Sequence, residues 1–308
     1  MNNISHLLTK NDSHFNILRI AGNLGEKVSI PVYIVGGYVR DILLGKPCKD
    51  IDIMVEGDGI VFAKMLAKEL NVTTTVDYDK FGTAMIPFPD LEIEVATART
   101  EKYNSNSRKP DITSSTVEED MSRRDFTINA IAASLSPSNF GELYDPFGGI
   151  NDLHKKRIIT PLNPDDTFSD DPLRMLRAIR FAAQLQYDIV SSTLDSITRN
   201  TNRLEIISWE RIRDEIIKSL KTEKPSLAFY LMKETGLLSY IFPEMDIMSG
   251  VEVINGKGHK DVFIHTLQVV DNAAKLSKKM EIRFAALVHD IAKPPTKRFN
   301  NVKGWTFH

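Results

Sequence analysis

The stretch Gly36-Gly37-Tyr38-Val39-Arg40-Asp41, followed by Asp50-Ile51-Asp52, decides the fold prediction. Asp50 and Asp52 are two residues apart in a segment that is typical of a strand, so both carboxylates point to one face of a sheet. Carboxylates so close repel one another unless cations neutralise them, and Mg²⁺ prefers carboxylate, phosphate and water oxygens. The pair therefore predicts a two-metal site.

The glycine turn before these carboxylates suits a phosphate ligand. Gly37 permits close backbone approach to a triphosphate, and the guanidinium fork of Arg40 matches phosphate oxygens. Short acidic motifs are common, so the Asp-x-Asp pair taken alone favours the alternative of a glycine turn beside a solvated strand end. The complete arrangement favours a nucleotidyl-transfer site, where metal ions activate a hydroxyl and hold a triphosphate.

The hydrophobic periodicity changes near residue 150. Before it, strands are predicted at 32–35, 51–55, 72–76, 83–87 and 92–98, and helices at 39–44 and 60–70. After it, helices are predicted at 172–185, 209–220, 226–235 and 263–276. The fold class is therefore α+β: a catalytic head at residues 1–150, an all-helical neck and body at 151–250, and a last segment at 251–308. Residues 103–116, rich in Ser, Asn, Lys and Pro, predict a loop.

Composition agrees with a soluble protein of two or three domains. The chain has 308 residues, of which 42% are hydrophobic, enough to fill more than one core. Acidic residues outnumber basic ones by 41 to 39, so any RNA-binding surface must be local, for example near the arginines at 174–180. The single cysteine, Cys48, excludes an internal disulfide. Without a signal-peptide pattern or a long apolar run, we expect a cytoplasmic protein with no membrane partner.

A second cluster lies at Arg123, Arg124 and Asp125, before an apolar run that predicts a helix beginning near Phe126. Asp125 could be the N-cap of that helix. Its carboxylate could instead accept a hydrogen bond from a ribose 2′-hydroxyl and so favour ribonucleotides, with Arg124 holding phosphate. Glu94 lies on an alternating strand and faces either the carboxylate pair or solvent; the pattern slightly favours solvent.

These segments together resemble the class II tRNA nucleotidyltransferases, the CCA-adding enzymes and bacterial poly(A) polymerases of the DNA polymerase beta superfamily. Five ordered segments carry the resemblance: 36–52, 122–130, 145–153, 170–174 and 210–215. It implies a polymerase-beta-like head with a mixed sheet and flanking helices. It also implies nucleotide-binding roles for Gly37, Arg40, Arg124 and Asp125. In that family a flexible loop lies at the position of 103–116 and matters for the switch from C to A addition.

A third cluster, which resembles the family's base-reading motif, recurs every three residues at Asp171, Arg174, Arg177 and Arg180. On one helix these residues form a ridge that drifts by about 60° per step. Asp171 accepts hydrogen bonds and Arg174 donates them. This pair suits cytosine and adenine, which each present an amine donor beside a ring-nitrogen acceptor, and rejects uracil and guanine, which present the reverse. The alternative is a salt bridge on a solvated helix. The drift turns Arg180 away from Asp171, toward phosphates or structural carboxylates, and gives Arg177 an intermediate direction. Asp170 stands where the family usually has Glu.

The C-terminal segment resembles an HD domain, a helical metal-dependent phosphohydrolase fold. His265-Thr266-Leu267 and the stretch at 286–294 carry this resemblance, which implies His265, His289 and Asp290 as metal ligands. A core histidine beside a capping acid is the alternative. The chain stops at His308, before the final aspartate that such sites need, so we expect a partial HD domain without phosphohydrolase activity.

The resemblance implies a template-independent enzyme that uses CTP and ATP to add or repair the CCA end of tRNA. Asp50 and Asp52 would bind Mg²⁺ while the tRNA 3′-hydroxyl attacks the α-phosphate and pyrophosphate leaves. Poly(A) polymerase is the nearest alternative, although residues 80–84 look more like the CCA-adding branch. A catalytically silent RNA-binding or metal-binding HD protein is an alternative of another class, which would have no need of both the carboxylate pair and the base-reading pair.

Overall fold

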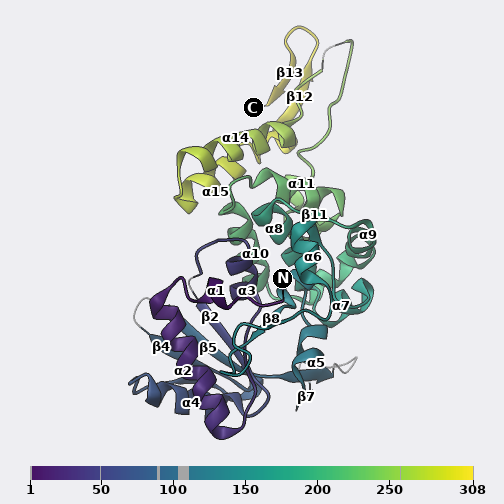
Figure 1. Ribbon diagram of the computed structural model, residues 1–308. Coiled ribbons are helices and arrows are strands. Elements are labelled where there is room, and N and C mark those ends of the chain that lie inside the picture. The colour runs from purple at the N-terminus through teal and green to yellow at the C-terminus, as the bar shows by residue number, and fades with distance from the viewer. Residues whose placement is uncertain (1, 49, 89–90, 103–110, 257, 308) are drawn as a thin grey trace. The chain divides into compact units, whose positions relative to one another are not determined.

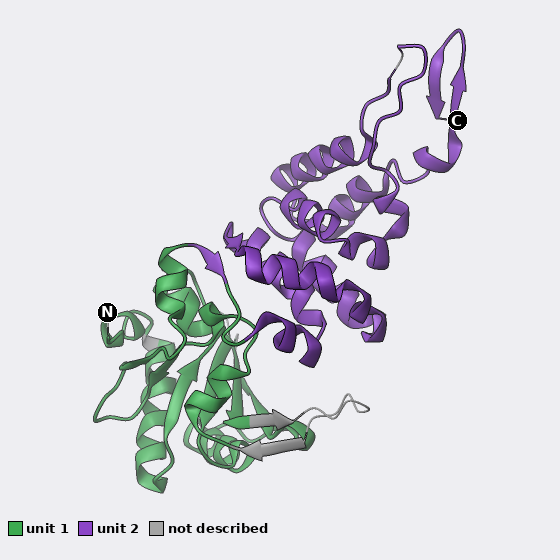
Figure 2. Cartoon of the chain, turned by 90° about the vertical axis from the view of Figure 1, so that its right-hand side faces the viewer, with its two compact units in different colours: residues 1–155, 159–162 green, residues 156–158, 163–308 purple. Residues whose placement is uncertain are grey.

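The structure is a computed structural model that describes residues 2–48, 50–88, 91–102, 111–256 and 258–307 (Figure 1). Its class is α+β, as predicted. The chain divides into two compact units (Figure 2). The first, called here the head unit, comprises Met1–Lys155 and Ile159–Leu162; the second, the helical unit, comprises Lys156–Ile158 and Asn163–His308.

A mixed seven-stranded sheet forms the centre of the head unit, in the order β3-β4-β5-β2-β1-β8-β9. β2 and β5 pair in parallel, whereas the other neighbours pair antiparallel. The strands are β1 (Val32–Val35), β2 (Asp50–Val55), β3 (Val76–Tyr78), β4 (Thr83–Phe88), β5 (Leu91–Thr97), β8 (Ala132–Ser134) and β9 (Leu143–Tyr144). A separate antiparallel pair consists of β6 (Arg99–Lys102) and β7 (Asp111–Ser114).

Helices cover this sheet because each presents one apolar face to it. α4 begins where the Asp58 carboxylate accepts the backbone N–H groups of Ile60 and Val61, and it buries Phe62 and Leu66 completely. α2 and α4 contact each other and the sheet (Figure 1). The helices are α1 (Ser5–Leu8), α2 (Asp12–Val28), α3 (Gly37–Leu43), α4 (Gly59–Glu69), α5 (Val117–Ser122) and α6 (Gly149–His154), with 3-10 turns η1 (Asp79–Phe81) and η2 (Thr127–Asn129).

The helical unit packs around α8, whose side chains are mostly buried. Its helices are α7 (Pro164–Asp170), α8 (Leu173–Leu185), α9 (Ser191–Asn200), α10 (Trp209–Leu220), α11 (Ser226–Glu234), α12 (Leu237–Ile241), α13 (Pro243–Asp246), α14 (Val262–Leu276), α15 (Met280–Val288) and α16 (Lys293–Thr296), with the 3-10 helix η3 (Thr201–Ile206). Two small sheets also occur here, β10 (Arg157–Ile158) with β11 (Asp188–Ile189), and β12 (Lys297–Asn300) with β13 (Gly304–Phe307).

Three local predictions were wrong. The strand predicted at 72–76 begins only at Val76, because residues 72–75 join no ladder. The helix predicted from Phe126 is one 3-10 turn followed by β8; the whole run is buried, and a buried apolar run has no period that separates helix from strand. Of the predicted loop, Asp111–Ser114 is a strand, while 103–110 lie outside the described residues.

No helix in the described ranges is long and apolar enough to cross a bilayer.

Candidate active site

The two predicted metal-binding carboxylates lie together on β2, as the spacing required. Asp50 is exposed and Asp52 is half-buried, while Ile51 between them is buried on the opposite face. In the parallel register Asp52 is the partner of Glu94 on β5. Glu94 is therefore both solvent-exposed, as slightly favoured, and next to the carboxylate pair. Three acidic side chains therefore lie on one face of the sheet, on the neighbouring strands β2 and β5.

The surroundings of Asp52 disfavour its ionised form. Its pKa is raised to about 6, first by burial and then by the charge of Glu94. Arg124 and Arg40 oppose that rise, and Asp50 adds to it. A half-buried carboxylate among acidic neighbours favours a proton or a cation, so the donor set fits a divalent metal that completes its shell with phosphate and water oxygens.

A left-handed glycine brings a guanidinium to these carboxylates. Gly36, between β1 and α3, has φ 67°. A Cβ atom there would lie 2.7 Å from Arg124 Nη1 and 3.9 Å from Asp52 Oδ2. Only glycine gives both the conformation and the space at this turn. At Gly37 the same hypothetical atom would make an ordinary 3.6 Å contact with Arg40 Nη2, so its proposed closeness to phosphate stays a prediction.

Arg40 is built into the protein interior. It is 5% exposed, its Nε lies 2.9 Å from Asp41 Oδ1, and its Nη1 donates to Asn129 Oδ1 at 2.6 Å. These contacts join α3 to η2 and fix the turn that carries Gly36. Phosphate binding by Arg40 stays a prediction, since the described contacts of its guanidinium are to protein groups.

Arg124 is held in place by a buried carboxylate on α5. Arg124 Nε and Nη2 each lie 3.1 Å from Asp120 Oδ2, and Arg123 Nη2 lies 2.5 Å from Asp120 Oδ1. Burial would raise the pKa of Asp120, but the two guanidinium groups hold it below its ordinary value. Asp120 thus orients Arg124 beside Gly36 and Asp52.

Asp125 is buried, and one of its oxygens accepts two hydrogen bonds. It is 7% exposed, and its Oδ1 accepts the Phe126 backbone N–H and the Asn129 Nδ2 amide, each at 2.9 Å. The alternative of an N-cap is wrong, because the short turn that follows begins after Phe126 and has no side-chain cap.

The base-reading residues do not form the predicted ridge on one helix. Asp171 ends α7 with an extended backbone (φ −139°, ψ 100°), and α8 begins only after Pro172. A residue before proline avoids the helical conformation, which explains the break. Asp171 Oδ1 accepts the Leu173 N–H at 3.2 Å, and its Oδ2 lies 2.8 Å from Arg211 Nη2 of α10. The structure therefore pairs Asp171 with a residue outside the predicted set.

The three arginines of α8 differ in surroundings. Arg174 is next to Asp171 along the backbone, its N–H donating to the Asp171 carbonyl at 3.0 Å. Arg177 lies over the Phe181 ring at 5.5 Å. Arg180 is buried, and its Nε lies 2.5 Å from Glu215 Oε2 of α10, the structural carboxylate that was one expected partner.

The predicted HD ligands also meet. His265, His289 and Asp290 offer ligand atoms within 4.8 Å of one another, a set that among the described residues could hold a metal ion. Asp290 Oδ2 lies 3.2 Å from His289 Nε2 and 2.6 Å from Lys293 Nζ. The ammonium group already neutralises the carboxylate, so metal binding here stays a prediction.

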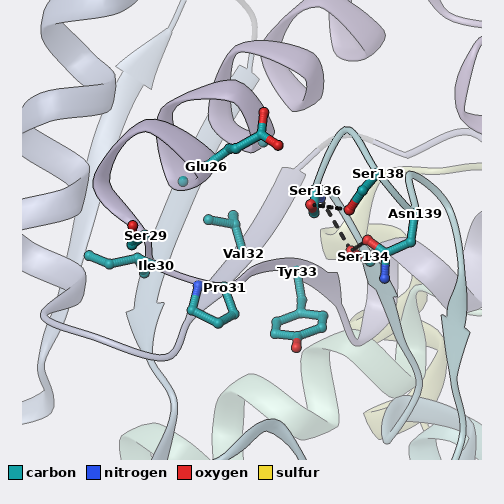
Figure 3. Close-up of a pocket in the computed structure, with 12 residues that line it drawn as sticks. Glu26, Ser29, Ile30, Pro31, Val32, Tyr33, Ser134, Ser136, Ser138 and Asn139 are labelled. Carbon is teal, nitrogen blue, oxygen red and sulfur yellow. Dashed lines mark hydrogen bonds between the residues drawn. The ribbon is translucent and has the colours of Figure 1, made fainter.

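A cavity of about 400 Å³ lies in the head unit (Figure 3), and none of the three carboxylates lines it. Val32 and Tyr33 line it, together with Ser134 and the loop that follows β8. Val32 pairs with Val55, at the end of β2 opposite to Asp50. The candidate active site is therefore the face of β2 and β5 that carries the carboxylates, and not this cavity.

Models of three domain families match consecutive parts of the chain. The Poly A polymerase head domain matches residues 32–159, the probable RNA and SrmB-binding site of polymerase A matches 186–248, and the HD domain matches 262–306. The solved structure of a CCA-adding enzyme in apo form II matches with a TM-score of 0.76 and 33% identity, over 94% of this chain and 67% of that one. The chain belongs to the class II CCA-adding enzyme and poly(A) polymerase family.

Two further relatives are similar in sequence to this chain. An A-adding tRNA nucleotidyltransferase of Geobacter sulfurreducens is 37% identical over 84% of this chain and 28% of its own length. A multifunctional CCA protein of Nitrosomonas europaea is 36% identical over 86% of this chain and 62% of its own length. The chain thus spans less than two thirds of either relative.

Solved complexes of CCA-adding enzymes with ATP and with CTP are each 32% identical to this chain over 93% of its length. Their TM-scores are 0.72 and 0.74, and the chain covers 65% and 64% of them.

Three residues of this family member were not singled out from the sequence. Asp120 could have been found from its spacing of three and four residues to Arg123 and Arg124 on a helix end. Asn129 and Arg211 lie inside quoted motifs, but their partners are far away in the sequence, so no local pattern indicated their contacts.

Proposed function

We propose that this chain is a template-independent tRNA nucleotidyltransferase that adds or repairs the 3′-terminal CCA from CTP and ATP. The observation that carries the proposal is the cluster of Asp50, Asp52 and Glu94 on one face of the sheet, beside the Gly36 turn and Arg124. A triphosphate needs both cations and a close backbone, and these residues supply a place for each. Family membership and the ATP and CTP complexes of related CCA-adding enzymes support the choice of substrates.

Each candidate site residue of the head unit has a specific role in this proposal. Asp50 and Asp52 hold divalent cations, for which we propose Mg²⁺; when bound, these lower the pKa of the attacking hydroxyl and neutralise the triphosphate. Arg124, with Gly37 and Arg40, orients the phosphates, and Asp125 accepts the ribose 2′-hydroxyl. The tRNA 3′-hydroxyl forms a bond to the α-phosphorus as the bond to pyrophosphate breaks, so one nucleotide is added per pyrophosphate released.

The helical unit supplies base selection in this proposal. Asp171 and Arg174 read the amine edge shared by cytosine and adenine, and Arg177 and Arg180 support them from α8. Because Arg180 is paired with Glu215 in the interior, its support acts through the position of α8. RNA contacts come from exposed basic groups of the helices.

A specific observation favours one second candidate, the addition of A alone. The Geobacter relative, 37% identical, is an A-adding enzyme. Both activities use the same acidic cluster, so the head geometry agrees with each.

Because Cys48 has no second cysteine in this sequence, we place either enzyme in the reducing cytoplasm.

The experiment uses tRNAs that lack one, two or three terminal nucleotides, with each nucleoside triphosphate alone and with CTP and ATP together. We expect the shortest tRNA to gain two cytidines with CTP and the final adenosine only when ATP is added. Extension solely of tRNA ending in CC would identify the A-adding enzyme, and long adenylate tails on any RNA would identify a poly(A) polymerase. Absence of incorporation in every lane would overturn the proposal.

A further inference from the structure

One buried amide connects the glycine turn to the residue proposed to bind ribose. Asn129, in the η2 turn, is 6% exposed. Its Oδ1 accepts from Arg40 Nη1 at 2.6 Å, and its Nδ2 donates to Asp125 Oδ1 at 2.9 Å. Three polar side chains that are each at least nine-tenths buried thus form one chain of hydrogen bonds, with no solvent to replace any lost partner.

The chemistry of the two partners fixes the orientation of the amide. A guanidinium only donates hydrogen bonds and an ionised carboxylate only accepts them. Asn129 satisfies both only with its oxygen toward Arg40 and its nitrogen toward Asp125. The amide in turn fixes the carboxylate, since Asp125 Oδ1 is held by Asn129 and by the Phe126 N–H together. Two bonds to one oxygen determine the plane of the carboxylate and hence the direction of the other oxygen.

We propose that Asn129 is a positioning residue for sugar selection: it holds Asp125 in the orientation that accepts a ribose 2′-hydroxyl, and through Arg40 it ties that orientation to the glycine turn. The inference rests on the proposed role of Asp125 and deepens it. A site built to bond a hydroxyl rejects the analogue that lacks it, so loss of this orientation lowers the preference for ribonucleotides.

A purely structural role would give a different result, and the same turn offers a control. Thr127 is 3% exposed, and its hydroxyl donates to Asp152 Oδ2 at 2.8 Å. Thr127→Val removes a buried side-chain hydrogen bond from η2 but leaves both bonds of the Asn129 side chain, to Arg40 and to Asp125, in place. General damage to the turn would therefore affect both variants alike.

The test compares kcat/KM for ATP and 2′-deoxy-ATP on tRNA ending in CC, and for CTP and 2′-deoxy-CTP on tRNA lacking all three nucleotides. We expect Asn129→Ser to reduce the ribose preference about tenfold, through loss with the ribonucleotides alone. Asn129→Asp keeps an acceptor for Arg40, which protects the fold, but replaces the donor to Asp125 by a like charge; it should reduce the preference at least as far. Thr127→Val should leave the preference unchanged.

Asp125→Ala separates failure of the inference from failure of the proposed function. If Asp125→Ala loses ribose preference but both Asn129 variants retain it, the inference is overturned while the role of Asp125 stands. If Asp125→Ala also retains the preference, the proposed ribose contact is itself wrong. Equal loss with ribo- and deoxyribonucleotides in the Asn129 variants would assign Asn129 to the fold alone.

Discussion

Two buried or half-buried carboxylates in the head unit, Asp52 on β2 and Asp120 on α5, have opposite electrostatics. Burial tends to raise the pKa of both. For Asp52 the neighbouring acid Glu94 adds to the rise, and the pKa reaches about 6. In the case of Asp120, the charges of Arg124 and Arg123 outweigh the effect of burial, and the pKa falls below its ordinary value. The sign of the nearest charges, and not burial, therefore separates a cation-binding carboxylate from one that anchors the structure.

The largest effect should come from removing the cation-binding member of the comparison. Asp52→Asn and Asp50→Asn should each reduce nucleotide addition by on the order of a thousandfold or more, because the reaction depends on the charge that holds the metal ions. Single-turnover incorporation into tRNA lacking its CCA end measures this. Asp77→Asn, on β3 of the same sheet and paired with exposed Lys64, is the control. Near-normal turnover in either site variant would end the catalytic assignment.

Removing the anchoring member should instead damage the fold. Asp120→Ala leaves two guanidinium groups without their shared carboxylate, which should cost about 3–5 kcal/mol of unfolding free energy in urea. Because the folded pKa of Asp120 lies below its ordinary 3.8, its contribution is fully present above that pH and is lost as the pH falls further. Addition should fall too, since Arg124 loses its orientation. A variant as stable as the parent would contradict the anchoring role.

Asp52→Asn should have the opposite effect on stability. The folded pKa of about 6 exceeds the ordinary 3.8, so the folded state binds the extra proton between these values and wild-type stability falls as pH rises through that window. The neutral amide avoids this cost, and the variant should be more stable by about 1–3 kcal/mol above pH 7 and equal to wild type below pH 4. Urea titrations at pH 4 and pH 8 test the sign. Addition of Mg²⁺ should raise the Tm of the wild type but not of Asp52→Asn.

The contrast between the carboxylates also shows what sequence could predict. The alternation around Ile51 was sufficient to place Asp50 and Asp52 on one face, because strand period is a local property. The partner strand was not local: Glu94 comes to Asp52 through a parallel pairing, which no residue pattern near either one specifies. Likewise, the bonds of Asn129 to Arg40 depend on η2 packing beside α3, 89 residues away in sequence.

The error at Asp171 had a different origin, because the signal was present. A spacing of three residues suggested one helix, but Pro172 follows Asp171 directly, and proline restricts the residue before it to extended conformations. The restriction before proline should have excluded Asp171 from the predicted helix. The correct consequence is that Asp171 stands between two helices, where its side chain can reach α10.

Asp171 is a third carboxylate for this comparison, and its guanidinium partner Arg211 is exposed. Substitution of Arg211 should therefore have the smallest effect. The side chains of Arg211 and Asp171 are 51% and 24% exposed, so their ion pair contributes less than about 1 kcal/mol to stability. Arg211→Ala should leave the urea midpoint almost unchanged. If Asp171 reads the base, however, its orientation matters more than the energy of the pair, and the variant should incorporate UTP or GTP severalfold more readily relative to CTP and ATP. Arg213→Ala, on the same helix and with its guanidinium on Asp214, is a matched control that should alter neither property.

Unchanged selectivity in Arg211→Ala together with altered selectivity in Asp171→Ala would show that the base edge is read without help from α10. Unchanged selectivity in both would make Asp171, like Asp120, a carboxylate that serves only to join helices.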